Sequence, residues 1–552
     1  MQTTRRNFLK SGGLLAAGLV AAAVADTKRP QRPNILYMMS DDHAAHAIGA
    51  YGGRLKQLNP TPTLDKLAQE GILLENCFCT NSICSPSRAT ILTGQYSHVN
   101  GVKSLGGKIQ RDRQYLPLTL KDTGYQTAAI GKWHLGIQPE AFDYYKVLDG
   151  QGKYHNPQFG ERKQGQAEKR ITDDGYCSDV ITDASLKWLK ERDRTKPFFL
   201  MHHFKAPHGP WDHADRYNDL YADIEIPEPE SLYNRDGFGS IATRGHNDEL
   251  VFAVGSSVGQ RNRHRNHLRH AKLKPDGKSS KEITHLAYQD YLKKYLRCVK
   301  GVDDNIKRLL DYLDGEGILD DTVVVYTSDQ GMMLGEHDYI DKRWMYEESL
   351  QMPFIVRYPK SIKAGTRSDA IVNNTDFAPT LLDFGGVNTP KQMQGKSFRK
   401  ILETGKEPSD WRQATYYRYW LHMAHHHNPA HFGIRTKEYK LIFFYGLSEK
   451  GSETQTPPGW ELYDMKKDPL EMMNVYGNVE YQDVVKKLKS HLIELRQEVG
   501  DNDKDNPAIL KVIEEHWEGG EEIAKEISNK SVKYWSRFDK SAEKSKKKKK
   551  VK

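Results

Sequence analysis

Cysteine is scarce in this sequence, with five residues among 552 and no C-x-x-C pair. The spacing of Cys77, Cys79, Cys84, Cys177 and Cys298 fits no zinc site and does not indicate a disulfide framework. This argues against a small disulfide-bonded module. One cysteine still needs a reason, because Cys84 lies in the polar stretch "NSICSPSRATILTG", where an exported protein normally keeps no free thiol.

Excess positive charge is absent from the body of the chain, although the formal net charge is +9. Residues 540–552 hold eight lysines and Glu543, or +7, and residues 1–25 add +3, so the remainder carries −1. This distribution removes the main support for nucleic-acid binding. We expect 520–552 to be a basic, disordered tail, with an ionic tether to an anionic polymer as the alternative.

The sequence also lacks a run that would give a stable membrane span. The uncharged stretch 11–25 is shorter than the roughly 20 residues that a helix needs to cross a bilayer. It follows Arg5 and Arg6 and ends in A-V-A, which is the layout of a twin-arginine signal peptide over 1–25. We expect cleavage after Ala25, export by the twin-arginine translocase and a periplasmic or secreted location. A membrane anchor is the alternative.

Apolar stretches of strand length alternate with helical stretches through the first two thirds of the chain. This pattern predicts an α/β domain over 32–385, with a large, mainly parallel sheet flanked by helices. The pattern changes after 385, where three aromatic-rich segments and an amphipathic helix at 481–500 predict a small α+β subdomain with an antiparallel sheet over 386–505. The strands expected in the first domain are 34–40, 125–131, 196–204, 321–329 and 352–359, and a long helix is expected at 285–317.

Four polar clusters each follow a predicted strand: "SDDH" (40–43), "GKWH" (131–134), "KAPH" (205–208) and "SDQG" (328–331). In open α/β sheets, sites gather at the carboxyl ends of the strands, so we expect these clusters to meet. Oxygen ligands without histidine or cysteine favour a hard cation over zinc. The pattern therefore predicts a Ca²⁺ site, with Mg²⁺ as the alternative, although each aspartate alone also fits a turn or a helix cap. The expected ligands are Asp41, Asp42, Asp329 and Gln330.

Basic and imidazole side chains accompany the carboxylates. Each of them alone would be read as a surface charge or a core histidine, but together, beside a cation, they suit a small oxyanion. The set consists of Arg88, Lys132, His134, His208 and Lys342.

The segment C-S-P-S-R at 84–88 resembles the type I sulfatase signature C-x-P-x-R, and "TGQYSHVNGV" continues it. Four further segments match this family in order: "RPNILYMMSDDH", "AAIGKWHLG", "KAPHGPW" and "YTSDQGMMLGEHDYIDKRWMYEESLQMPFIVRYP". The resemblance covers roughly 32 to 500 and implies an alkaline-phosphatase-like fold. It also implies that a formylglycine-generating enzyme or an anaerobic sulfatase-maturating enzyme converts Cys84 to formylglycine (3-oxoalanine), so that this residue is not kept as a thiol.

The resemblance implies a role for each residue of the set. The hydrated formylglycine at position 84, bound to the cation, attacks the sulfur of a sulfate ester, while Lys132 and Lys342 neutralise the sulfate oxygens. His208, or Lys342 beside it, protonates the leaving oxygen, and His134 takes the proton that releases sulfate. Arg88 steadies the loop. Gln330 departs from the Asn or His that the family often has, but it also offers a carbonyl oxygen.

The C-terminal segments resemble those of carbohydrate sulfatases of the N-acetylglucosamine-6-sulfatase kind. This similarity implies a substrate with 6-O-sulfated N-acetylglucosamine or a sulfated polysaccharide fragment. Histidines of the run 422–431 and a nearby arginine are expected to touch the sugar, and the insert 226–280 is expected to form another wall of the cleft. A surface loop is the alternative for the histidines. For the whole chain, the alternatives are a phosphate-ester hydrolase or a non-catalytic glycan-binding protein. The expected sugar contacts are His425, His427, His431 and Arg435.

Overall fold

The computed structural model describes residues 32–274, 276–449, 451 and 454–550, without the side chains of 270 and 539–550. The expected signal peptide at 1–25 lies outside the described residues. No helix among the described residues has the length and apolar character that crossing a membrane requires.

A ten-stranded sheet forms the centre of the large domain, in the order β13-β2-β12-β9-β1-β8-β4-β5-β6-β7. The five strands from β9 to β5 are parallel to one another, whereas β12, β6 and β7 join them in antiparallel pairs. The prediction of a mainly parallel sheet thus holds at its centre, and the flanks make the sheet mixed. The strands are β1 (Asn34–Ser40), β2 (Ile72–Leu74), β4 (Gln126–Gly131), β5 (Tyr144–Leu148), β6 (Gln158–Lys163), β7 (Lys169–Thr172), β8 (Phe198–His203), β9 (Thr322–Ser328), β12 (Phe354–Arg357) and β13 (Thr366–Ser368).

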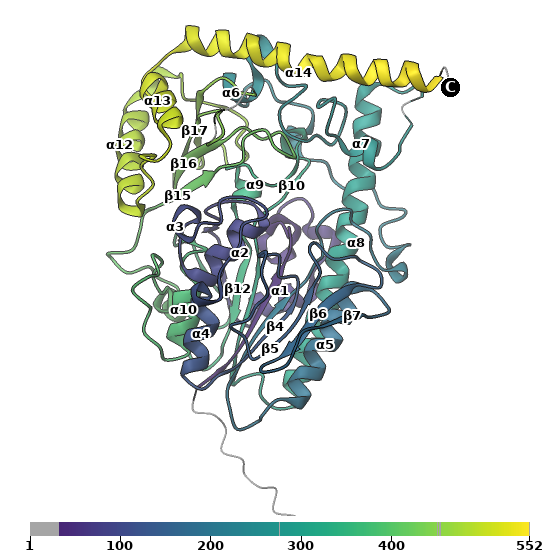
Figure 1. Ribbon diagram of the computed structural model, residues 1–552, viewed down its shortest axis with the longest axis vertical. Helices are drawn as coiled ribbons and strands as arrows, with labels where there is room; N and C mark the ends of the chain where they lie inside the picture. Colours follow the sequence, from purple (N-terminus) through teal and green to yellow (C-terminus); the bar gives the residue numbers. More distant parts are fainter. Residues whose placement is uncertain (1–31, 275, 450, 452–453, 551–552) are drawn as a thin grey trace, which may run out of the picture.

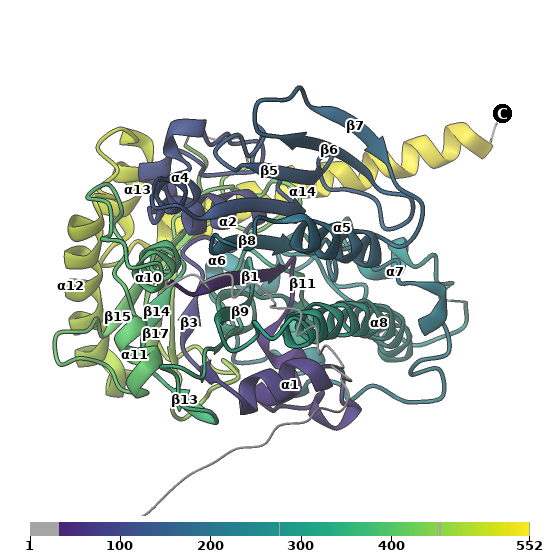
Figure 2. The ribbon, with the colours of Figure 1, turned by 90° about the horizontal axis from the view of Figure 1, so that it is seen from below.

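Alternate residues of the central strands feed two separate apolar layers. Leu36 and Met38 of β1 pack with helices on one face, and Ile35, Tyr37 and Met39 pack with helices on the other. The first layer contains α1 (Pro62–Gln69), α5 (Cys177–Glu191) and α8 (Ser280–Gly315), and the second contains α2 (Cys84–Thr93), α4 (Tyr115–Asp122), α10 (Phe377–Phe384) and α11 (Arg399–Thr404). Figure 2 shows α5 and α8 on one side of the strands and α10 on the other. Strands buried on both faces explain the nearly continuous apolar runs in the sequence.

The C-terminal part is built on an antiparallel sheet, as predicted, and this sheet has four strands (Figure 1). Its strands are β15 (Ala414–Tyr419), β16 (His431–Thr436), β17 (Tyr439–Phe444) and β18 (Gly459–Asp464). One face is covered by α12 (Gln482–Val499) and α13 (Pro507–His516). The other face packs on the large domain through an aromatic cluster that includes Trp344, Tyr417 and Phe444.

The expectation of a disordered tail from 520 is corrected over the described residues. The chain forms α14 (Glu521–Lys550), which crosses the small sheet in Figure 1. Ala524, Ser528, Ser531 and Trp535 are buried, and their spacing of three to four residues places them on one face of the helix. Because most of these buried residues are small, the sequence carries little apolar signal for this helix.

Candidate functional site

Two neighbouring strand ends bring the carboxylates together. Strands β1 and β9 pair in parallel with Ser40 opposite Ser328, so the residues that follow each strand lie at the same level. Asp42 has a left-handed backbone (φ 68°), and its N–H donates to Asp329 Oδ1 over 3.1 Å. Asp41, Asp42 and Asp329 are buried, and each offers an oxygen within 4.8 Å of the others. The sequence-predicted acidic cluster is therefore present.

Cys84 faces this cluster from the first residue of α2. Its Sγ lies 3.3 Å from Asp41 Oδ1 and 3.9 Å from Gln330 Nε2. Burial raises the pKa of the Cys84 thiol to about 12, so an unmodified thiol is neutral and weakly nucleophilic near neutral pH. The residue has the position of a nucleophile but, as a thiol, not the chemistry of one.

Arg88 lies on α2, one helical turn after Cys84. Its Nε donates to Asp329 Oδ2 over 2.9 Å, and its Nη1 donates to the backbone oxygen of Lys132 over 2.6 Å. The guanidinium is buried and ties α2 to the ends of β4 and β9. It is a positioning group for the cluster.

Lys132 and Lys342 bring two more buried cations to the aspartates. Lys132 Nζ contacts Asp41 Oδ2, and Lys342 Nζ lies 2.5 Å from Asp42 Oδ2. Burial by itself lowers the pKa of Lys342, but the attraction of Asp42 outweighs burial and raises the pKa above its usual value. Burial, and then repulsion from Lys205, lowers the pKa of Lys132 well below its usual value, so the positive charge of Lys132 depends on its contact with Asp41. Arg88 and the two lysines together face three buried carboxylates and offset the repulsion among them.

The two predicted histidines reach the site from separate loops. His208 Nδ1–H donates a hydrogen bond to the backbone oxygen of Gly209 over 2.7 Å, and its Nε2 faces Asp42 Oδ2 at 3.7 Å. His134 is half-buried, with Nδ1 3.5 Å from Ser85 Oγ. Burial, and then repulsion from Lys132, lowers the pKa of His134 to about 3. Both rings are held neutral at the edge of a cationic site.

A cavity of about 480 Å³ opens onto this cluster. His208 and Lys342 lie in its wall, and the insert 226–280 contributes His267 and Ala271, as expected. The lining also includes residues that the sequence analysis did not assign to the site. Among them are Trp211, Lys294, Asp341 and Arg343, whereas the lining residue His426 belongs to the histidine run that was expected to touch the sugar. Of these residues, Arg343 could have been found from the sequence, because it adjoins Lys342.

The expected sugar-binding residues separate into one that lines the cavity and three that do not. His425 lines it. His427 instead packs its ring on Trp535 at 4.6 Å, and His431 is fully buried against Tyr417. Arg435 forms two hydrogen bonds with Glu347.

The physical reason for this correction is strand alternation. His431 and Arg435 lie on the same face of β16, and that face packs on the large domain instead of the cavity. The neighbouring His426 reaches the cavity wall, where its Nε2 lies 3.5 Å from Asp341 Oδ1.

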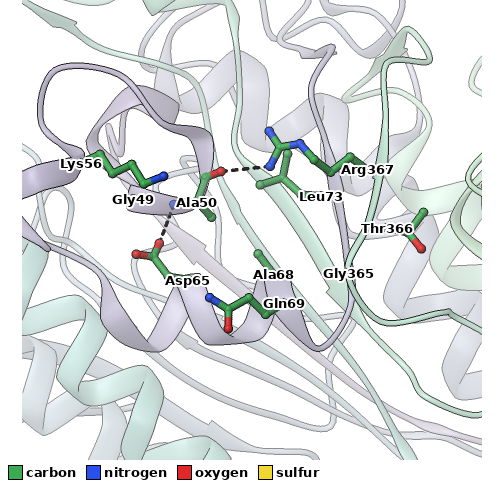
Figure 3. Close-up of a pocket in the computed structure, with 10 residues that line it drawn as sticks. All are labelled: Gly49, Ala50, Lys56, Asp65, Ala68, Gln69, Leu73, Gly365, Thr366 and Arg367. Atoms are coloured by element: carbon green, nitrogen blue, oxygen red, sulfur yellow. Dashed lines mark hydrogen bonds between the residues drawn. The ribbon is translucent and has the colours of Figure 1, made fainter.

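A second pocket, drawn in Figure 3, is lined by Lys56, Asp65 and Arg367 among others. Ala50 bridges its two sides, donating from N to Asp65 Oδ1 over 2.6 Å and accepting from Arg367 Nη1 over 3.1 Å. None of the carboxylates, cations or histidines described above lines it. It is therefore a surface hollow apart from the site.

Comparison with known proteins agrees with this geometry. The model of the sulfatase family matches residues 33–387, and a model described as N-sulphoglucosamine sulphohydrolase, C-terminal, matches 335–498. The chain belongs to the sulfatase family. It is a sulfuric ester hydrolase, and the type I sulfatase resemblance found in the sequence is confirmed.

Among the relatives of this sulfatase, an N-acetylglucosamine-6-O-sulfatase of Bacteroides thetaiotaomicron is 41% identical, over 89% of this chain and 91% of the relative. The human N-acetylglucosamine-6-sulfatase is 29% identical over 73% of this chain and 69% of its own. A solved structure of a protein in complex with its substrate D-glucosamine-2-N,6-O-disulfate has a TM-score of 0.77 and 40% identity, covering 86% of this chain and 99% of that one.

A more distant structure, the phosphonate monoester hydrolase of Agrobacterium radiobacter, shares the fold. It has a TM-score of 0.65 and 22% identity, covering 85% of this chain and 96% of its own. The alkaline-phosphatase-like fold expected from the sequence is thus confirmed.

Proposed function

We propose that this sulfatase hydrolyses the 6-O-sulfate ester of N-acetylglucosamine, or of a related glucosamine unit, in a sulfated glycan. The observation that carries the proposal is the 41% identity, over nearly the whole chain, to a relative named for this substrate. The cavity supports it, because aromatic, imidazole and guanidinium groups surround a cationic base and suit a sulfated sugar.

A hard divalent cation is the proposed resident metal, Ca²⁺ with Mg²⁺ as the alternative. The donor set fits it: Asp41, Asp42 and Asp329 converge, and the buried Gln330 Oε1 has no hydrogen-bond partner among the described residues, so its lone pairs are available to a metal. The charges fit as well, because the buried carboxylates are already balanced by Arg88 and two lysines, so a divalent ion leaves the site positive toward a sulfate ester. When bound, the cation supplies a Lewis acid that polarises oxygen.

Formylglycine at position 84 is the proposed nucleophile, made by a formylglycine-generating or an anaerobic sulfatase-maturating enzyme. The raised pKa of the buried Cys84 thiol supports conversion, since the thiolate itself is disfavoured there. The modified residue supplies a hydrated aldehyde, whose hydroxyl attacks and whose collapse releases sulfate without hydrolysis of an ordinary ester.

The remaining work falls to side chains of this chain. Lys132 and Lys342, held against Asp41 and Asp42, place two ammonium groups where they neutralise sulfate oxygens. His208 turns Nε2 toward Asp42 and the cavity because its Nδ1–H donates to the backbone oxygen of Gly209. Burial and the nearby lysines lower the pKa of His208, so the neutral ring must first take up a proton on Nε2, which an anionic sulfate ester in the cavity favours, before it donates that proton to the departing sugar oxygen. His134, on the opposite loop, is neutral and suited to accept a proton.

A panel of defined sugars tests the substrate. Sulfate release is expected from N-acetylglucosamine-6-sulfate and from N-sulfoglucosamine-6-sulfate, and not from galactose-6-sulfate, glucosamine-3-sulfate or N-sulfoglucosamine without a 6-sulfate. The last compound is included because the C-terminal family model is named for an N-sulfate substrate. Release from galactose alone, or only from the N-sulfate, would contradict the proposal.

We further propose that the protein works in the periplasm or outside the cell after export through the twin-arginine translocase. The support is the sequence of residues 1–25. N-terminal sequencing of the exported protein is expected to begin at Asp26. A product that still begins upstream of Arg5 would contradict cleavage.

A further inference from the structure

The segment 261–274 is a strongly basic strip on the surface. The sequence has no acidic residue between Glu249 and Asp276. Five basic side chains of the strip are exposed, and of these Arg265, Lys272 and Lys274 form no ion pair with any residue that the structure describes. The exposed cations are Arg263, Arg265, Arg269, Lys272 and Lys274.

This strip is the outer side of the catalytic cavity wall. It contains α7 (His267–His270), and His267 and Ala271 line the cavity from within. His267 packs its ring on Trp211 at 5.4 Å, so the strip is fixed to another lining residue. Burial, then Arg343 and then Arg265 lower the pKa of His425 on the facing loop, so Arg265 lies close to this cavity residue. A chain leaving the cavity on this side meets the exposed cations.

The C-terminal helix packs against this strip and presents one exposed cation, Arg537, beside it. Trp535 packs on His427 at 4.6 Å and on His264 of the strip at 6.5 Å. Figure 1 shows α14 crossing above the small sheet toward the side of α7 and α8. Arg537 follows this anchor in the sequence.

The distribution of charge indicates a polyanionic ligand. Outside the tail and residues 1–25 the chain carries −1, yet basic residues are concentrated in one segment beside the cavity. A cavity of about 480 Å³ holds a small ligand, so a longer chain extends past its mouth. A row of exposed cations attracts repeated negative charges along such a chain.

We propose that this basic rim, defined as residues 261–274 together with Arg537, binds the part of a sulfated glycan that extends out of the catalytic cavity. The preferred substrate is therefore an oligo- or polysaccharide with sulfates beyond the reacting one. The inference rests on the proposed function for the reacting unit.

Three proteins test the rim against the native enzyme. The first is the rim variant Arg265→Gln, Arg269→Gln, Lys272→Gln and Lys274→Gln, and the second is Arg537→Gln, which keeps Trp535. The third is a control that removes four exposed basic side chains away from the rim. The control carries Lys363→Gln, Lys391→Gln, Lys486→Gln and Lys487→Gln.

Binding is measured first, because it needs no turnover. The rim variant, and to a smaller extent Arg537→Gln, are expected to leave immobilised heparin at a lower salt concentration than the native and control proteins. The same variants should lose less of their binding to duplex DNA of equal charge than of their binding to heparin. Equal elution of all four proteins, or an equal loss on DNA, would overturn the assignment to a sulfated glycan, even if the enzyme proves inactive on glucosamine sulfates.

Turnover then separates the rim from the cavity. On a long heparin-type oligosaccharide, kcat/KM of the rim variant is expected to fall about tenfold at low salt, with the difference closing at high salt. On a monosaccharide 6-sulfate, kcat/KM of the rim variant should equal that of the native enzyme. An equal fall on both substrates would show damage to the site and would overturn the proposal. Inactivity of every protein on both sugars would instead count against the proposed function.

Discussion

At the scale of single residues, the site is a set of buried charges whose neighbours define their roles. Asp329 accepts from Arg88, Asp42 from Lys342, and Cys84 lies against Asp41. Removing one member of such a set leaves its partner buried without compensation, which costs several kcal/mol. The chemistry therefore depends on residues that contact each other more than on any one of them.

Conversion of Cys84 is the first prediction at this scale. The peptide that carries residue 84 should be lighter by about 18 Da than its cysteine form, since a thiol is replaced by an aldehyde. Mass spectrometry of protein from a host with the maturating enzyme checks this. Cys84→Ala should lose sulfatase activity by more than about a thousandfold. Full activity with an unchanged cysteine peptide would contradict the mechanism.

His208 gives a prediction that depends on the leaving group. His208→Ala should slow hydrolysis of a sugar sulfate by about 10² to 10⁴-fold, because an alkoxide leaves poorly without a proton. With 4-nitrophenyl sulfate, whose phenolate needs no proton, the loss should be less than about tenfold. Comparison of kcat for the two substrates measures the split. Equal losses on both would assign His208 to binding instead of proton donation.

At the scale of elements, the contact between α9 (Glu347–Leu350) and β16 fastens the small sheet to the large domain. Arg435 donates two hydrogen bonds to Glu347, and Lys440 Nζ lies 2.8 Å from the same carboxylate. Burial opposes ionisation of Glu347, but Arg435 outweighs it, and the pKa of Glu347 falls to about 2. Arg435 is thus part of the joint and not of the cavity.

This joint makes stability depend on acid. The folded-state pKa of Glu347 is lower than its usual value. The ionised side chain therefore adds to the free energy of unfolding in full above the usual pKa, and this contribution is lost as pH falls toward about 2. Glu347→Gln should lower the free energy of unfolding by about 3 kcal/mol at neutral pH, and this difference should narrow between about pH 4.5 and 2. Urea unfolding at several pH values measures it.

Arg435→Met separates the joint from a sugar contact. The variant should unfold at lower urea than the native protein and keep its KM for small substrates. Arg367→Met, which breaks an exposed pair with Glu75, is the matched control and should change stability by less than about 1 kcal/mol. A raised KM with native stability would return Arg435 to substrate binding.

How well the sequence predicts each element depends on how clear a pattern its buried and polar residues make. Strand β1 was predicted with the bounds that the structure has, and the four polar clusters met as expected, because parallel strand ends share one edge. The prediction that His431 and Arg435 contact the sugar was wrong. In a sequence, polar residues of a strand that packs against another domain look the same as residues of a binding site. The α14 helix was missed because its buried face consists mostly of Ala and Ser, so the expected disorder is overturned over the described residues.

At the scale of the whole molecule, segments from the full length of the large domain meet only in the folded chain. Asp42 and Lys342 are 300 residues apart in sequence, yet their side chains are in contact. Such non-local sites form late and depend on overall stability. A cation that binds only the assembled site therefore stabilises the entire fold and not just its ligands.

Removal of the metal gives the last prediction. Chelation should abolish turnover and lower the midpoint of thermal unfolding by about 3 °C, because an ion at about 100 times its Kd adds about 2.7 kcal/mol to the folded state. Added Ca²⁺ should restore both, without any change in the mass of the residue-84 peptide. Asp329→Asn removes one carboxylate oxygen of the site, so its melting midpoint should no longer respond to chelator. A native enzyme that melts and turns over identically with and without chelator would show that Asp41, Asp42, Asp329 and Gln330 hold no ion, and that Arg88, Lys132 and Lys342 alone balance the cluster.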